Sequence, residues 1–103
     1  MEKFWKSITA SEAKEIIKQK SPDGDFCILD VRTRKEFLSG AIPNAISLDF
    51  YASDFSQKLD ALDKNKIYLI YCRSGNRSKS ALAMMKQLGF GYVYELDGGI
   101  VSL

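Results

Sequence analysis

Histidine is absent from this 103-residue sequence, and cysteine occurs only twice. Without imidazole, serine–histidine–aspartate hydrolases, cysteine–histidine proteases and most zinc sites are excluded as they are usually built. Cys27 and Cys72 are too few for a disulfide scaffold. No apolar run approaches the length of a membrane span, and residues 1–6 lack the apolar core of a signal peptide. We therefore expect a cytoplasmic protein that holds no metal ion or other cofactor and does not bind membranes.

The charge of the chain is nearly balanced, with 15 basic and 13 acidic residues and a formal net charge of +2. Such a balance argues against nucleic-acid binding as the main activity. The length suits one compact domain, with 46% hydrophobic residues to form its core. We expect a single domain over residues 1–103 and a monomer.

Helical and strand patterns alternate along the chain. Thr9 and Glu12 have the spacing of a capping box, and Thr33 and Glu36 repeat it. Helices are predicted at residues 10–20, 33–38, 54–62 and 79–88, and strands at residues 26–31, 45–48, 67–71 and 92–96. Alternation with short connections predicts an α/β fold with a mostly parallel central sheet and helices on both faces.

The most informative stretch runs from residue 67 to residue 88. A β-prone apolar run, residues 67–71, leads to Cys72, and a polar loop then enters a helix-forming run. Backbone N–H groups in such a loop converge at the helix N-terminus, where the helix dipole adds positive potential. This arrangement predicts an anion cradle around an easily ionised thiol.

Cys72 has two interpretations, a packed core thiol or a reactive nucleophile. Arg73, Arg77 and Lys79 follow it with no acid between them, and cations and a helix N-terminus lower a thiol pKa. We therefore favour a functional Cys72. Cys27 lies in the middle of an apolar strand without a local cation, which favours a core thiol.

Other polar residues in this region have two interpretations each. Arg73 and Arg77 could simply be solvated residues at the start of a helix. Arginine there opposes the helix dipole, however, and an anion between the two would relieve that penalty, which favours a functional role. Ser78 could donate a hydrogen bond to the sulfur, as Ser74 could, or it could be an ordinary helix N-cap. Asp30 and Arg32, at the end of the 26–31 strand, could form a structural ion pair, contact substrate directly, or do both.

Three ordered motifs closely resemble the single-domain rhodaneses, the thiosulfate sulfurtransferase family. The loop Cys72-Arg73-Ser74-Gly75-Asn76-Arg77-Ser78 resembles that family's active-site loop. Leu29-Asp30-Val31-Arg32-Thr33, with Gly40 to Ala45, resembles its first signature, and Asp97-Gly98-Gly99-Ile100 its closing segment. Ala41 stands where the family commonly has histidine, a difference that we expect to affect stability or partner contacts before chemistry.

The resemblance implies a role for each position of the loop. Cys72 would be the nucleophile that accepts sulfur and cycles between thiolate and persulfide. The loop from Arg73 through Ser74, Gly75, Asn76 and Arg77 to Ser78 would bind the substrate, while Asp30 and Arg32 would support it from beside the loop. The expected partners are a small anionic sulfur donor such as thiosulfate and a thiophilic acceptor, which is cyanide, a thiol or a protein.

Two rival functions are compatible with the same fold. Cysteine-dependent phosphatases and arsenate reductases separate cysteine from arginine by five residues, which enlarges the cradle for a tetrahedral oxyanion. Here four residues separate Cys72 from Arg77, and Ser78 occupies the position at which a phosphatase needs arginine. The second rival is a non-catalytic binding module, against which the intact Cys72 argues.

Overall fold

Capping boxes start two of the helices in this computed structural model, which describes residues 1–103. The Thr9 hydroxyl accepts a hydrogen bond from the Glu12 N–H at 3.1 Å, and Glu12 Oε1 accepts one from the Thr9 N–H at 3.0 Å. Thr33 and Glu36 repeat this reciprocal pair at 3.2 and 3.1 Å. Both predicted capping boxes are thus confirmed, and they satisfy N–H groups that a helix start leaves without partners.

Five parallel strands form one sheet in the order β1-β5-β4-β2-β3. The strands are β1 (Phe4–Ile8), β2 (Phe26–Asp30), β3 (Ile46–Ser47), β4 (Ile67–Tyr71) and β5 (Tyr92–Leu96). The helices are α1 (Ala10–Lys20), α2 (Arg34–Leu38), α3 (Phe55–Asp60) and α4 (Asn76–Gln87), followed by the 3-10 turn η1 (Ile100–Ser102). The predicted α/β fold with a parallel sheet is confirmed.

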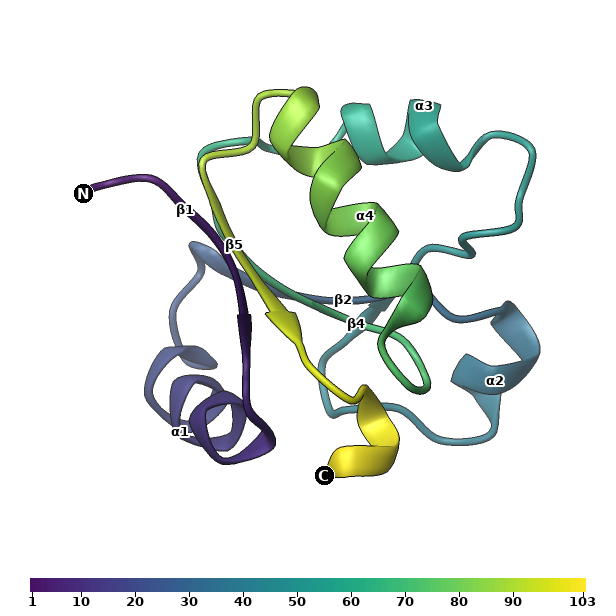
Figure 1. Cartoon of the computed structure of the whole chain (residues 1–103), viewed down its shortest axis with the longest axis horizontal. Coiled ribbons are helices and arrows are strands. Elements are labelled where there is room, and N and C mark those ends of the chain that lie inside the picture. The colour runs from purple at the N-terminus through teal and green to yellow at the C-terminus, as the bar shows by residue number, and fades with distance from the viewer.

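Helices cover both faces of the sheet, with α1 on one side and α3 and α4 on the other (Figure 1). Strand β4 is buried along its whole length, and its side chains alternate between two cores. Tyr68 and Ile70 pack toward α3 and α4, whereas Leu69 and Tyr71 pack toward α1. Because this central strand is enclosed, the residue that follows it is held by packing on every side.

The structure differs from the sequence predictions mainly at strand β1 and at the helices α4 and α3. Strand β1 was not predicted; it pairs with β5 from the other end of the chain, where local pattern carries no information. Helix α4 begins at Asn76, inside the predicted loop, because Gly75 adopts a left-handed conformation and serves as N-cap. Helix α3 ends at Asp60, and its N-cap Asp54 makes no side-chain capping bond.

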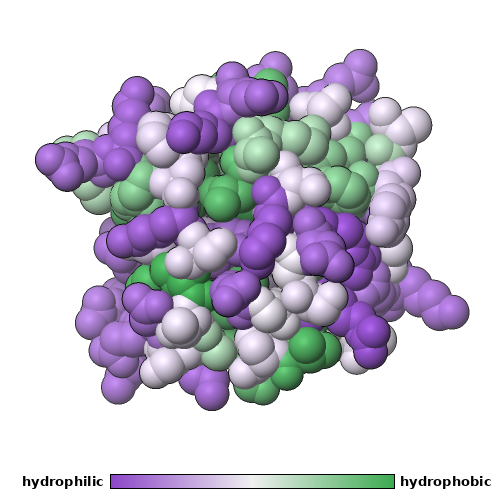
Figure 2. All heavy atoms as spheres, viewed as in Figure 1, coloured by the Kyte–Doolittle hydropathy of each residue, from purple (hydrophilic) through white to green (hydrophobic).

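The surface around α4 mixes hydrophilic side chains with smaller hydrophobic areas (Figure 2). None of the helices combines the length and the apolar composition needed to cross a bilayer.

Candidate active site

Cys72 follows β4 directly, at the carboxyl end of the sheet, where ligands bind in open parallel α/β folds. Its side chain is 1% exposed. The Tyr71 carbonyl accepts a hydrogen bond from the Val31 N–H at 3.0 Å, and the Cys72 carbonyl accepts one from the Ile100 N–H at 2.9 Å. Backbone bonds from two other segments thus fix the chain on either side of the sulfur.

The loop after Cys72 curls back over the sulfur at Gly75. Gly75 has φ +112°, a conformation that other residues rarely adopt. Its N–H donates a hydrogen bond to Cys72 Sγ at 3.0 Å, and the Ser78 hydroxyl lies 3.4 Å from the same atom. Ser78 sits in the first turn of α4, so the helix dipole acts on the sulfur at close range. The N-cap of α4 is Gly75, so the interpretation of Ser78 as an ordinary helix N-cap is wrong.

These contacts decide the ionisation of the thiol. Burial by itself raises the pKa of Cys72, but the Ser78 hydroxyl, when its proton is directed at the sulfur, and the backbone N–H groups of Ser78, Gly75 and Ser74 outweigh it and lower that pKa below its ordinary value. The arrangement stabilises a thiolate at the centre of converging donors. The predicted convergence of loop donors on Cys72 is present in the structure, and anion binding there stays a prediction.

Cys27 has the opposite surroundings. It is half-buried near the start of β2, in register with Tyr68 rather than with the end of β4. Burial raises its pKa, and the charge of Lys66 offsets this only in part. It lines a small cavity of about 130 Å³, and none of the Cys72 loop residues lines that cavity. The two cysteines are free and do not form a disulfide.

We expect iodoacetamide to modify Cys72 at a lower pH than Cys27, because the pKa of Cys72 is lowered and that of Cys27 is raised. Initial alkylation rates of each cysteine, measured by peptide mass spectrometry across a pH series, report the two ionisation midpoints separately from access to the thiol. In the unfolded protein the two profiles should coincide. Coincident midpoints in the folded protein would contradict the description of the cradle.

The cations of the loop are mostly paired with distant acids. Arg77 forms a bidentate ion pair with Glu36 of α2, at 2.7 and 3.1 Å. Lys79 Nζ lies 2.8 Å from Asp97 Oδ1. Among Arg73, Arg77 and Lys79, only Arg73 forms no salt bridge, and its side chain is exposed. The sequence placed no acid among these three cations, but folding brings acids from elsewhere in the chain to two of them.

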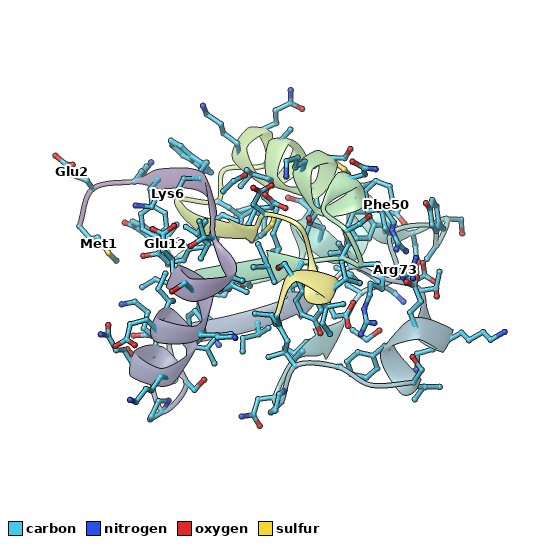
Figure 3. The ribbon with its side chains drawn as sticks, turned by 60° about the horizontal axis from the view of Figure 1, so that its bottom comes forward. Met1, Glu2, Lys6, Glu12, Phe50 and Arg73 are labelled. Carbon is cyan, nitrogen blue, oxygen red and sulfur yellow. The ribbon has the colours of Figure 1, made fainter.

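Arg73 is exposed in the loop that follows Cys72. In Figure 3 it lies on the same side of the molecule as Phe50 and far from Met1, Glu2 and Lys6. In Figure 1 the loop between β4 and α4 lies between α2 and the C-terminal turn.

Replacing Glu36 by Gln is expected to cost about 1 kcal/mol of stability at pH 7, the range of a partly exposed bidentate pair. Arg77, and to a smaller extent the Thr33 cap, lower the pKa of Glu36 from 4.5 to about 2. A lowered carboxyl pKa stabilises the folded state fully above about pH 4.5, and this contribution is lost as the pH falls toward 2. Urea unfolding of both proteins at pH 7, 4 and 3 should show the difference shrinking.

Glu12→Gln is the matched control, because Glu12 occupies the same capping-box position in α1 and forms no salt bridge. Glutamine preserves the capping-box geometry in both helices. A pH-independent difference for Glu36→Gln, or an equal effect of Glu12→Gln, would show that the Arg77 pair does not stabilise the fold.

Asp30 and Arg32 form a buried ion pair beside the loop. Arg32 Nη2 lies 2.7 Å from Asp30 Oδ2 and also donates to the Gly40 carbonyl at 2.6 Å. The Tyr71 hydroxyl donates to Asp30 Oδ2 at 2.7 Å and accepts from the Ile42 N–H at 3.1 Å. This network ties β2, β4 and the 40–42 segment together. The ion pair is present as one interpretation expected, and direct contact with substrate stays a prediction.

Glu95 is the residue at this site that the sequence interpretation missed. It lies on β5, is fully buried, and accepts hydrogen bonds from Ser78 at 2.6 Å and from Ser7 at 2.5 Å. Lys79 Nζ lies 3.5 Å from Glu95 Oε1, the oxygen that also accepts from Ser7. The only signal in the sequence was an acid near the carboxyl end of an apolar strand, the same placement as Asp30.

Residues 9–103 match the family model for the rhodanese-like domain. The chain belongs to the rhodanese-like family. A protein of Allochromatium vinosum named sulfurtransferase is 37% identical over 76% of this chain and 71% of its own length. A rhodanese-like domain protein of Staphylococcus aureus has a solved structure with TM-score 0.79 and 32% identity, covering 94% of this chain and 89% of that one.

Some relatives of this rhodanese-like domain are larger proteins with another name. The tRNA uridine(34) hydroxylase of Cytophaga hutchinsonii is 38% identical over 76% of this chain, which spans only 26% of that protein. The shared part is therefore the rhodanese-like domain alone.

The closing segment of the rhodanese-like domain supports the active-site loop directly. Beyond the bond from Ile100 to Cys72, the Val101 N–H donates to the Arg73 carbonyl at 3.2 Å. Gly99 packs so closely on the backbone of Arg73 and Ser74 that a side chain there would overlap it. Two motifs far apart in the sequence thus form one unit.

Proposed function

We propose that this rhodanese-like domain is a sulfurtransferase that moves sulfane sulfur from thiosulfate, or a related persulfide donor, to a thiophilic acceptor through a persulfide on Cys72. The observation that carries the proposal is the position of Cys72 Sγ, 3.0 Å from the Gly75 N–H and 3.4 Å from the Ser78 hydroxyl, at the N-terminus of α4. Such donors stabilise a thiolate and then the terminal sulfur of a persulfide.

The reaction proceeds by double displacement. The Cys72 thiolate attacks the outer sulfur of thiosulfate and forms a new S–S bond. The bond between the two thiosulfate sulfurs breaks, and sulfite leaves with the electron pair. A thiophilic acceptor (cyanide, a thiol or a protein thiol) then attacks the outer sulfur of the persulfide and restores the thiolate. Arg73, exposed and without a salt bridge, attracts the anionic donor.

The geometry favours sulfur transfer over phosphate chemistry. A phosphatase loop needs an arginine inside the cradle, but Arg77 is directed to Glu36 and Ser78 occupies the following position. The Gly75 N–H donates directly to the Cys72 sulfur, so the loop closes around a single sulfur atom. The hydroxylase activity that the larger relatives are named for is not proposed for this chain, because the chain spans only 26% of the Cytophaga hutchinsonii protein.

The test is to incubate the protein with thiosulfate, remove the excess and weigh it. We expect a mass gain of one sulfur that is lost when cyanide is added, with release of thiocyanate. Turnover of an aryl phosphate without a mass gain would favour a phosphatase. Neither activity would favour a non-catalytic binding module.

A further inference from the structure

The Ser78 hydroxyl has one proton and three neighbours that could accept it. Cys72 Sγ lies at 3.4 Å, the Gly75 carbonyl at 3.1 Å and Glu95 Oε2 at 2.6 Å. The carboxylate is both the nearest acceptor and the strongest, since charge-assisted bonds are shorter and stronger than neutral ones. While Glu95 is ionised, the hydroxyl proton points to Glu95, and Ser78 presents only lone pairs to the sulfur.

That orientation suits a thiol and opposes a thiolate. A neutral Cys72 can donate its S–H to Ser78, but a thiolate would face a lone pair on one side and the Glu95 charge behind it. For Ser78 to donate to the thiolate, Glu95 must carry a proton of its own and donate it to Ser78 Oγ. The protonation states of Cys72 and Glu95 are thus linked through a single hydroxyl group.

No cation near Glu95 is placed to neutralise its carboxylate fully, so the link between Cys72 and Glu95 remains. Ser7 of β1 contributes a neutral hydroxyl to Oε1 at 2.5 Å. Lys79 of α4 is the one cation in contact, at 3.5 Å, but its Nζ lies closer to Asp97, at 2.8 Å, and its side chain is 49% exposed. Arg77, the other cation of this turn, is engaged by Glu36. A Glu95 carboxylate together with a Cys72 thiolate would therefore place two buried anions on either side of one hydroxyl group, which has a single proton to donate.

We propose that Glu95 is a positioning residue for Cys72, which takes up the thiol proton through Ser78 and thereby directs the Ser78 hydroxyl at the thiolate. The Cys72 S–H bond breaks as an O–H bond forms on Ser78, and the original Ser78 O–H bond breaks as one forms on Glu95 Oε2. Only protons move, so nothing is oxidised or reduced, and the net charge of Cys72, Ser78 and Glu95 together stays at minus one. The thiolate then receives bonds from Ser78 and from the Gly75 N–H.

This inference deepens the proposed function, because it rests on Cys72 reacting as a thiolate, and its tests use no sulfur donor. In the wild-type protein the alkylation rate of Cys72 should rise with pH in two steps, because the Cys72 thiol is linked through Ser78 to a second site that can hold the proton. Glu95→Gln replaces the carboxyl by an amide whose N–H donates permanently to Ser78. We expect one step in this variant, with the maximum rate reached about one pH unit lower and a roughly tenfold faster rate on the rising limb.

Asp97→Asn is the matched control, because it removes a carboxylate from the same Lys79 cluster without contacting Ser78. We expect it to keep the two-step profile. An unchanged profile in Glu95→Gln, or equal shifts in both variants, would overturn the proposal and leave Glu95 as a structural contact.

Infrared spectroscopy of wild-type protein with ¹³C-labelled glutamate tests the same step without a variant. We expect a protonated-carboxyl band at neutral pH that disappears when Cys72 is alkylated and is absent from Ser78→Ala. No such band, or a band indifferent to alkylation, would overturn the proposal even if Glu95→Gln failed to fold. A sulfurtransferase without the relay would fail these tests and still gain sulfur from thiosulfate, so the two proposals fail separately.

Discussion

Replacing Cys72 by Ser is expected to abolish the mass gain on incubation with thiosulfate and to reduce sulfur transfer to cyanide below detection. Serine has nearly the same shape, so the packing at the end of β4 changes little. Its hydroxyl, however, does not ionise in the cradle at neutral pH and cannot hold a sulfur as a persulfide. The donors that lower the pKa of Cys72 would then surround a group without the charge that they stabilise.

Cys27→Ser is the control for this experiment. Cys27 lies near the start of β2, and burial raises the pKa of its thiol, so its removal should leave the mass gain unchanged. A sulfur adduct that persists in Cys72→Ser, or that is lost in Cys27→Ser, would place the reactive thiol elsewhere. Far-ultraviolet circular dichroism on both variants verifies that each is folded.

Replacing Gly99 by Ala is expected to reduce sulfur transfer by roughly 100-fold or more, because displacing a catalytic loop by about 1 Å costs that much. A Cβ at this position would overlap the Arg73 carbonyl group and lie 2.5 Å from the Ser74 nitrogen. Gly99 also has φ +65° with ψ −167°, a region that is essentially restricted to glycine. The backbone conformation alone should cost about 1–3 kcal/mol of stability, and relief of the overlap must move the Cys72 loop.

Gly24→Ala is the matched control, because a Cβ there meets nothing within 4 Å and its backbone has no unusual φ. Urea unfolding separates lost stability from lost activity, and the alkylation profile of Cys72 reports the loop itself. Under conditions in which Gly99→Ala is fully folded, we expect the pKa of Cys72 to move up toward its ordinary value as the Gly75 bond is lost. Wild-type activity in that variant would show that the closing segment does not support the loop.

The sequence determined features whose physics is local. A capping box needs only residues three apart, so Thr9 with Glu12 and Thr33 with Glu36 could be read directly. The cradle around Cys72 is likewise formed by the next six residues and the helix that they start. The alternation of apolar strands and helices was sufficient for the parallel sheet.

The tertiary structure alone decided which charges meet. Glu36 and Arg77 are 41 residues apart, and Ser7 and Glu95 are 88 apart. Strand β1 likewise exists because it adds to the edge of β5. Pairings of this kind depend on which elements the sheet order makes neighbours, and no local pattern encodes that order. The sequence therefore located Cys72 and its loop, whereas the fold decided that two of the three nearby cations are paired and that a buried acid lies behind Ser78.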